Sequence, residues 1–195
     1  MMKTALMFLA LSSLVIGLTI ATSDPVLDIS GQELQTGTDY YILPVIRGSG
    51  GGLTLGNEPC PLDVVQEQLE VSNGLPLTFS PVTNEDVVRL STDLNIKFSA
   101  ASTCVQTTLW TLQTDESIQK RAVTTGGVEG NPGKDTLSNW FNIQKYQDDY
   151  KLVFCPTVCN TCRPACGDLG IFIDDAGHRR LVISEEPFKV MFKRA

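Results

Sequence analysis

The sequence contains an internal threefold repeat of short apolar segments, and this repeat limits the possible folds more than any other feature. Its clearest copy follows Asp149, where Tyr150, Leu152 and Phe154 alternate with other residues. Alternation with a period of two is typical of a strand with one buried face. Similar segments follow Asp39 and Asp93, so the copies recur at an interval of roughly 55 residues.

Each copy contains three further apolar segments after the first. The second segments are 53–55, 109–112 and 169–171, the third are 64–65, 122–123 and 181–183, and the fourth are 77–79, 141–143 and 190–192. One copy cannot bury its own apolar face, so three copies must close on one another. The sequence therefore predicts an all-β fold, the β-trefoil, with three four-strand repeats around a pseudo-threefold axis.

Residues 1–21 have the organisation of a secretory signal peptide. Lys3 gives a positive start, residues 5–20 are apolar, and small or neutral residues at 19–21 precede the expected cleavage site. A membrane anchor is the competing interpretation, but a spanning helix needs about 20 apolar residues and this run is short. We expect a mature protein of residues 22–195 that is secreted, either extracellular or vacuolar, and not attached to a membrane.

The mature chain has the size of a single domain with a substantial core. Ten prolines and sixteen glycines divide it into short segments, and no Pro/Ser-rich linker separates two parts. The formal net charge is −7, and loss of Lys3 with the leader makes the mature protein more acidic. An acidic chain gives no electrostatic support for a nucleic-acid partner.

Six cysteines, an even number, are present in the chain. They are Cys60, Cys104 and a cluster of Cys155, Cys159, Cys162 and Cys166. In a cytosolic protein the cluster would suggest zinc. A secreted chain folds in an oxidising compartment, which favours disulfides instead. The pairing does not follow from the sequence alone, and we expect neither a metal nor another cofactor.

The residues expected for catalysis are largely missing. His178 is the only histidine and follows Asp174 and Asp175 in a polar turn. A Ser-His-Asp arrangement would have to use this histidine, but an exposed hairpin is the simpler interpretation. The glycine run 48–52 lacks the Lys-Ser/Thr of a phosphate-binding loop and indicates a hairpin loop. We therefore predict that the protein is not an enzyme.

Several longer motifs resemble a known family. Residues 26–34 (VLDISGQEL), followed by Tyr40-Tyr41-Ile42, resemble the N-terminal signature of the plant Kunitz-type soybean trypsin inhibitor family, whose members are secreted β-trefoils. Ser30 departs from this signature, which usually has an acidic residue, Asn, Thr or Tyr there. The miraculin branch is the most similar, through the segments 40–47 (YYILPVIR), 50–54 (GGGLT), 85–89 (EDVVR) and 151–159 (KLVFCPTVC). The resemblance covers the mature chain and implies a protease inhibitor that acts in plant defence.

The resemblance also implies a cysteine pairing and a functional loop. The pairing is Cys60–Cys104, with Cys155–Cys166 enclosing Cys159–Cys162. The loop lies between the strands 77–79 and 94–98, with its scissile bond near Thr83–Asn84, and would bind an endopeptidase. It consists of Ser80, Pro81, Val82, Thr83, Asn84 and Glu85. A loop held in an extended, substrate-like shape binds a protease cleft with little ordering cost and is cleaved slowly.

Two residues depart from the pattern of trypsin-directed members. Those members carry Arg or Lys before the scissile bond, whereas this chain has Thr83 or Asn84 there and two acidic residues, Glu85 and Asp86, close by. The sequence therefore predicts weak inhibition of trypsin or none. Thr36 corresponds to the asparagine that supports the loop in the family, and we expect its shorter side chain not to reach the loop carbonyls.

Two other functions stay open at this stage. The first is a non-inhibitory miraculin-like storage or defence protein on the same scaffold, with residues 80–86 as an ordinary polar connection. The second is carbohydrate binding, which occurs in trefoils generally, although no aromatic-plus-acid cluster recurs in all three copies here. The sequence specifies neither a target protease nor an oligomeric state.

Overall fold

The computed structural model describes residues 23–57 and 59–195, so the predicted signal peptide lies outside the described residues. This part of the chain contains twelve strands and one short 3-10 helix, η1 (Lys134–Asn139). The strands are β1 (Tyr40–Pro44), β2 (Leu53–Leu55), β3 (Val64–Gln66), β4 (Leu77–Pro81), β5 (Leu94–Phe98), β6 (Thr111–Asp115), β7 (Lys120–Thr124), β8 (Asn142–Tyr146), β9 (Asp149–Phe154), β10 (Gly167–Ile173), β11 (Arg179–Ser184) and β12 (Lys189–Arg194). They fall into the three predicted sets of four.

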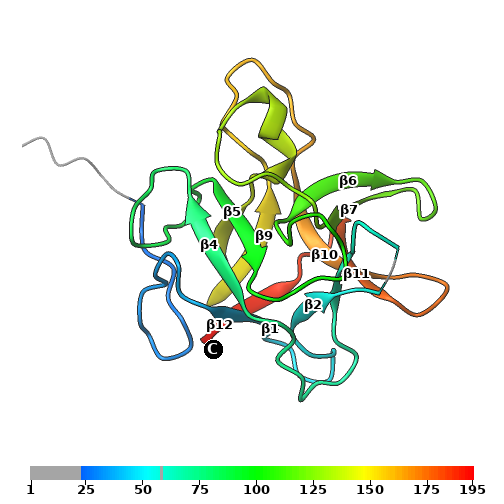
Figure 1. Ribbon diagram of the computed structural model, residues 1–195. Helices are drawn as coiled ribbons and strands as arrows, with labels where there is room; N and C mark the ends of the chain where they lie inside the picture. Colours follow the sequence, from blue (N-terminus) through cyan, green and yellow to red (C-terminus); the bar gives the residue numbers. More distant parts are fainter. Residues whose placement is uncertain (1–22, 58) are drawn as a thin grey trace, which may run out of the picture.

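The first and fourth strands of every repeat form a closed barrel (Figure 1). Long antiparallel pairings join β4 to β5, β8 to β9 and β12 to β1. Shorter pairings join β1 to β4 and β9 to β12, and a bridge between Leu94 and Phe141 joins β5 to the start of β8. The first and last strands of the domain are therefore neighbours, and the barrel has no open edge.

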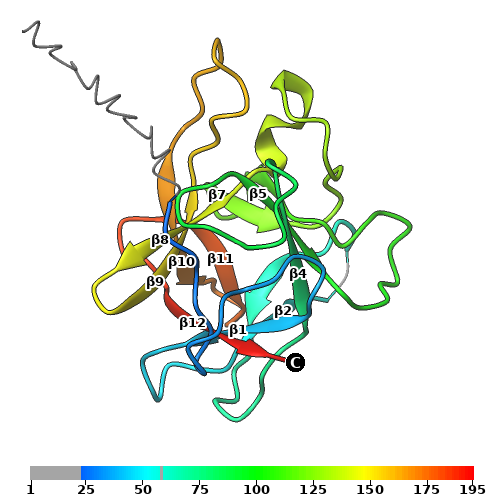
Figure 2. The ribbon, with the colours of Figure 1, turned by 90° about the vertical axis from the view of Figure 1, so that its left-hand side faces the viewer.

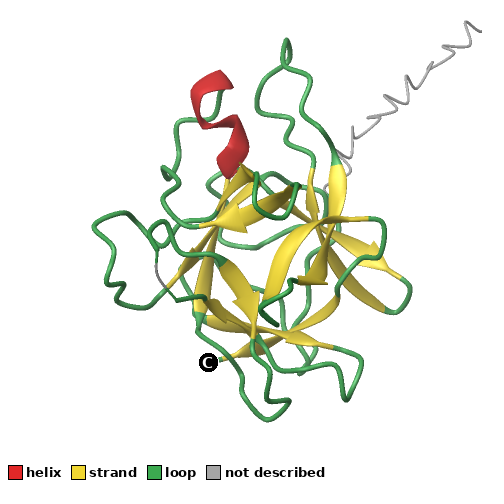
Figure 3. Cartoon of the chain, turned by 90° about the vertical axis from the view of Figure 1, so that its right-hand side faces the viewer, coloured by secondary structure: helices red, strands yellow, loops and turns green. Residues whose placement is uncertain are grey.

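The second and third strands of every repeat form three hairpins at one end of the barrel (Figures 1 and 3). β11 contacts the other two hairpins, through Arg180 opposite Val65 of β3 and Val182 opposite Ala122 of β7. This threefold arrangement of barrel and hairpins confirms the predicted β-trefoil.

One predicted strand begins later than the sequence pattern suggested. β6 starts at Thr111 rather than at Leu109. Leu109 and Trp110 are instead held against β5, where Leu109 bridges Lys97 and the Trp110 amide donates to the Ile96 carbonyl at 2.9 Å. Apolar alternation marks buried residues, and these two residues are buried through contacts with a strand of their own repeat before the hairpin begins.

Aromatic side chains fill the barrel interior. Trp110 packs edge-on against Phe141 with ring centroids 5.9 Å apart, and Phe79 meets Phe192 in the same way at 5.6 Å. Such pairs stabilise a core beyond the effect of buried area alone. Trp140 is also buried, and its indole nitrogen donates to the Thr136 hydroxyl at 3.2 Å. Both tryptophans therefore belong to the interior, as their apolar sequence neighbours predicted.

A buried arginine connects the hairpins by ion pairs. Arg180 of β11, with a side chain only 8% exposed, donates to the carboxylates of Asp63 before β3 and Asp115 at the end of β6. The Asp115 pKa is lowered to about 2 by hydrogen bonds from Ser117 and by Arg180, against the opposing effect of burial. Burial raises the pKa of Asp63, although Arg180 opposes this shift. The three repeats thus share one charge cluster in the hairpin region.

The glycine run in the connection between β1 and β2 lies close to a neighbouring loop. Gly50 has a φ of +98°, and a Cβ there would lie 2.7 Å from the Glu67 carbonyl oxygen. Both the backbone conformation and the close approach require glycine at this position. The run is therefore a loop with positive φ, as predicted, but it is not a hairpin loop, because β1 pairs with β12 and β4 whereas β2 pairs with β3.

Three disulfides are present among the described residues, with no free cysteine there. They join Cys60 to Cys104, Cys155 to Cys166 and Cys159 to Cys162, which is the pairing that the family resemblance implied. The second pair encloses the third within one loop, and Figure 2 shows this loop projecting from the end of the barrel beyond β9.

We expect the denatured, unreduced mature protein to contain no reactive thiol. Reduction should lower its stability, because the Cys60–Cys104 bond closes a loop with a sequence separation of 44 and the chain-entropy model gives such a loop about 4 kcal/mol. Thiol titration and urea unfolding with and without reductant measure both effects. Four titratable thiols, or bound zinc released by a chelator, would contradict the disulfide assignment.

Candidate functional site

The connection between β4 and β5 contains the loop that the family resemblance pointed to. Its tip is exposed from Thr83 to Asp86. Ser80 and Pro81, which we predicted as loop residues, instead belong to β4, opposite Asn95 and Leu94 of β5. Proline lacks a backbone N–H and is tolerated here because β4 pairs only with β5 at this point, its pairing with β1 being at Leu77. The loop therefore begins at Val82.

The loop tip is a turn and not an extended segment. The Asn84 amide donates to the Pro81 carbonyl at 3.1 Å, and Asn84 has a φ of 52°. Asparagine is one of the few residues that readily occupy this left-handed region. The predicted scissile bond between Thr83 and Asn84 thus lies within a tight turn. The expectation of an extended backbone at this bond is wrong for the free protein.

The N-terminal side of the loop is fixed to the barrel. The Val82 amide donates to the Asp93 carbonyl at 2.9 Å, directly before β5 begins. The buried carboxylate of Asp93 accepts hydrogen bonds from the amide and the hydroxyl of Thr157, at 2.7 and 2.6 Å. Through Asp93 the base of the loop is linked to the segment that carries the Cys155–Cys166 bond.

The C-terminal side of the loop pairs with residues 24–36, near the start of the described residues. The Val26 amide donates to Val88 O and the Val88 amide to Leu34 O, both at 2.9 Å, and the Leu90 amide donates to Asp24 O at the same distance. Val26, Leu34 and Val88 are fully buried. The N-terminal segment 24–36 therefore holds residues 86–90 by backbone hydrogen bonds and by apolar contact.

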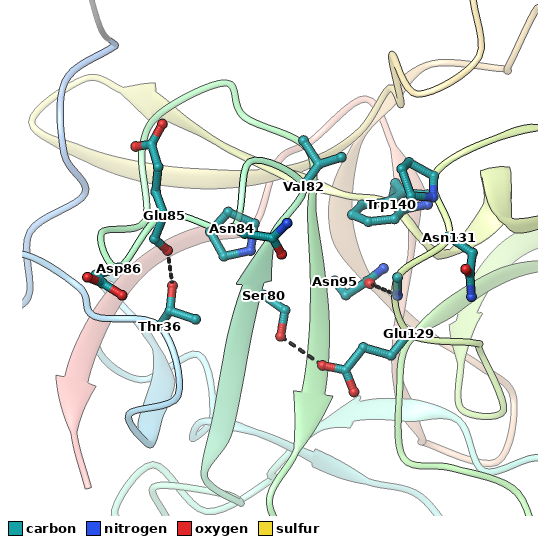
Figure 4. A pocket seen from close by; sticks show the side chains of 13 residues that line it. Thr36, Ser80, Val82, Asn84, Glu85, Asp86, Asn95, Glu129, Asn131 and Trp140 are labelled. Atoms are coloured by element: carbon teal, nitrogen blue, oxygen red, sulfur yellow. Dashed lines mark hydrogen bonds between the residues drawn. The ribbon is translucent and has the colours of Figure 1, made fainter.

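Thr36 reaches the loop, contrary to our expectation. Its hydroxyl donates to the Glu85 carbonyl at 2.8 Å, and its amide donates to the Asp86 carbonyl at the same distance (Figure 4). The side chain is long enough because backbone pairing brings Thr36 directly beside the loop. Within the described residues, its hydroxyl makes no hydrogen bond to Val82 or Thr83, so it supports only the side that follows Asn84.

The loop tip carries negative charge. Glu85 forms an ion pair with Arg89 at 2.7 Å, and Arg89 also donates to the Ser23 carbonyl at 3.0 Å. Asp86 is exposed and has no ion-pair partner among the described residues. An exposed ion pair contributes little stability, so its main effect here is to hold the Glu85 side chain toward Arg89.

A groove of about 430 Å³ lies beside the loop and is bounded on its far side by residues 129–132 (Figure 4). The buried Asn95 side chain fixes that second segment, because its amide donates to Asn139 O and its oxygen accepts from the Gly130 amide, both at 2.8 Å. Ser80 adds a hydrogen bond to Glu129 at 2.9 Å. We did not predict Asn95 as a site residue, although a buried amide within the apolar strand LNIKF is a signal that could have indicated it.

The described residues give no indication of a metal site. His178 is exposed on the β10–β11 hairpin, where its Nδ1 lies 3.1 Å from Asp174. Within residues 23–57 and 59–195 there is no group of three or more His, Cys, Asp or Glu side chains able to hold a metal ion. In the same residues, no helix has the length and apolar character needed to span a bilayer.

Comparison with known proteins places this geometry in a family. The family model of trypsin and protease inhibitors of the legume Kunitz type matches residues 26–194. Kunitz trypsin inhibitor 5 of Arabidopsis thaliana is 53% identical, with 91% of this chain and 89% of the relative covered. Miraculin of Synsepalum dulcificum is 51% identical, with 88% and 83% covered.

A solved structure agrees with the sequence relatives. Soybean trypsin inhibitor is 35% identical and superposes with a TM-score of 0.73, over 88% of this chain and all of that structure. The matched residues include all three repeats, the loop between β4 and β5, and the six cysteines. The chain belongs to the plant Kunitz-type family of trypsin and protease inhibitors.

Proposed function

We propose that this chain is a secreted inhibitor of an endopeptidase and that residues 82–86 enter the protease cleft. The observation that carries the proposal is the exposed loop tip whose two sides are both fixed, to Asp93 before it and to Thr36 after it. A loop fixed in this way loses little conformational entropy on binding, and its cleaved ends stay in place. Membership in an inhibitor family supports the same function, and we infer that the protein is not itself an enzyme.

The residue before the scissile bond sets the proposed specificity. Thr83 is small, polar and exposed, and it cannot form the ion pair that a trypsin pocket makes with Arg or Lys. The acidic side chains of Glu85 and Asp86 add repulsion toward an acidic pocket. We therefore propose a target that accepts a small polar residue, encountered in the extracellular space or the vacuole.

One observation favours the non-inhibitory alternative. An extended peptide binds along a protein edge through hydrogen bonds of its own backbone. In the Pro81–Asn84 turn the Pro81 carbonyl already accepts a hydrogen bond from the Asn84 amide, and Asn84 has a positive φ, so this backbone is not extended. Binding to a protease in extended form requires this turn to open. Miraculin, at 51% identity, is a named relative whose name does not describe an inhibitor.

An inhibition panel tests the two functions. Purified mature protein is titrated against trypsin, subtilisin, an elastase-type protease, papain and an aspartic protease. We expect slow, tight inhibition of at least one protease that accepts Thr, and weak or no inhibition of trypsin. Failure to inhibit any of them, or rapid cleavage after Thr83, would reject the inhibitor proposal and favour the non-inhibitory alternative.

A further inference from the structure

A second groove, also of about 430 Å³, lies between the β6–β7 hairpin, η1 and the disulfide-bridged loop 155–166. The helix and this loop rise from the same end of the molecule (Figures 1 and 3). Three basic side chains line the groove, one from each segment: Arg121 of β7, Lys134 of η1 and Arg163 of the bridged loop. All three are exposed, and we call this site the basic groove.

The three basic side chains of the basic groove lack the polar or aromatic contacts that most other Lys and Arg side chains make. Most Lys and Arg side chains of the described residues contact a carboxylate, a hydrogen-bond acceptor or an aromatic ring, as Lys151 does with Asp168 at 2.8 Å. Within the described part of the chain, Arg121, Lys134 and Arg163 have no such contact. Among the described residues, the other Lys and Arg side chains without such a contact are Arg47, Lys193 and Arg194. Half of this group therefore gathers in a single groove.

This gathering is notable in an acidic chain. With 22 acidic residues against 15 basic ones, the chain as a whole has more carboxylates than cations. Asp135 is the only acidic residue that lines the basic groove, so the lining has an excess of positive charge. A concave surface lined by one sign of charge concentrates ligands of the opposite sign. The groove is therefore suited to an anion.

The other lining groups narrow the kind of anion. Gln113 and Thr114 line the groove with exposed amide and hydroxyl side chains, which match the hydroxyls of a sugar. Two of its apolar lining residues, Leu112 and Phe154, are almost fully covered, at 9% and 4% exposed.

We propose that the basic groove binds an acidic polysaccharide, a chain of sugars that carries carboxylate or sulfate groups. The guanidinium groups of Arg121 and Arg163 suit bidentate pairing with such oxyanions, and Lys134 adds a third positive charge. Arg163 lies in the loop closed by the Cys155–Cys166 bond and directly follows Cys162 of the inner bond, so little backbone ordering is needed on binding. This site is separate from the loop at 82–86, shares no lining residue with its groove, and does not depend on protease inhibition.

Two variants with the same net charge test the proposal. The groove variant combines Arg121→Gln, Lys134→Gln and Arg163→Gln, and the control variant combines Arg47→Gln, Lys193→Gln and Arg194→Gln. Each protein is passed over immobilised polygalacturonate, dextran sulfate, uncharged dextran and polyglutamate at low and at physiological salt. The first two supports distinguish carboxylate from sulfate groups, and polyglutamate represents an acidic peptide.

We expect the wild type and the control variant to bind polygalacturonate, dextran sulfate or both, and to elute as the salt concentration rises. The groove variant should bind on the order of tenfold more weakly, because it loses three exposed ion pairs, each of which contributes modestly. Equal binding by the groove variant and the wild type, or equal loss in both variants, would overturn the proposal. Absence of wild-type binding to both polysaccharides would also overturn it, as would stronger binding to polyglutamate, which would indicate a peptide partner.

Discussion

Replacing Thr83 with arginine should give this protein clear inhibition of trypsin, which the wild type inhibits weakly or not at all. The new side chain would form a desolvated, charge-assisted pair in the acidic pocket. Such pairs contribute about 2 to 5 kcal/mol, or roughly thirtyfold to several-thousand-fold in affinity. Titration of trypsin activity with the purified variant measures the change. Thr83→Met is the matched control, because it supplies a side chain of similar reach without the charge.

The response of the variant also shows how well the loop is fixed. Thr36 holds only the Glu85 side of the turn, so Thr36→Asn should strengthen inhibition further if its longer side chain also reaches a carbonyl before Asn84. Inhibition by Thr83→Arg alone would mean that the turn at Pro81–Asn84 opens easily and that only the specificity differs from trypsin-directed relatives. Rapid cleavage of both variants after position 83 would show that the loop is an ordinary substrate.

The second large effect is expected at Arg180, which lies between Asp63 and Asp115. Arg180→Met should lower the free energy of unfolding by about 3 to 5 kcal/mol at neutral pH, because it leaves two partly buried carboxylates without their shared partner. Urea unfolding measures this loss. Arg194→Met removes an exposed charge and should change stability by less than about 0.5 kcal/mol.

Two further measurements separate the lost ion pair from a simple packing defect. Adding Asp63→Asn and Asp115→Asn to Arg180→Met removes the unpaired charges and should restore most of the stability. Without Arg180 the pKa values of both carboxyls rise, so the folded variant binds protons more readily than the folded wild type. The destabilisation should therefore shrink as the pH falls toward 4. A loss that is unchanged by pH and by the Asn substitutions would contradict this explanation.

The repeat architecture was readable from the sequence because it depends on local alternation. Residues such as Tyr150, Leu152 and Phe154 mark a buried strand face whatever surrounds them, and three copies of the pattern imply closure. The boundary of β6 was less predictable. Leu109 and Trp110 are buried by contact with β5, and they do not take part in the hairpin pairing of β6. Periodicity reports burial, and it does not report which neighbour provides it.

The conformation of the loop and the burial of Arg180 depend on distant residues. Thr36 is 49 positions from Glu85, to which it donates a hydrogen bond. The two carboxylates that Arg180 binds lie 117 and 65 positions away in the sequence, in the other two repeats. In the sequence Arg180 follows a polar turn and resembles an exposed strand end. Nothing in its local neighbours indicates the two carboxylates, so only the closed fold brings this cluster together.

The pairing of residues 24–36 with the loop has a consequence for maturation. If the leader ends at Ala21, as the sequence predicts, the Asp24 carbonyl that accepts from Leu90 lies within a few residues of the new N-terminus, and so does the Ser23 carbonyl that accepts from Arg89. In that case the exact N-terminal residue determines how firmly the C-terminal side of the loop is held. That residue depends on where a signal peptidase cuts and on how far an aminopeptidase later trims the end. Trimming past Val26 removes both of these contacts, and also the hydrogen bond from the Val26 amide to Val88 O, while leaving every residue of the loop intact. Two preparations of the same gene product that differ by a few N-terminal residues would then differ in how easily the loop opens.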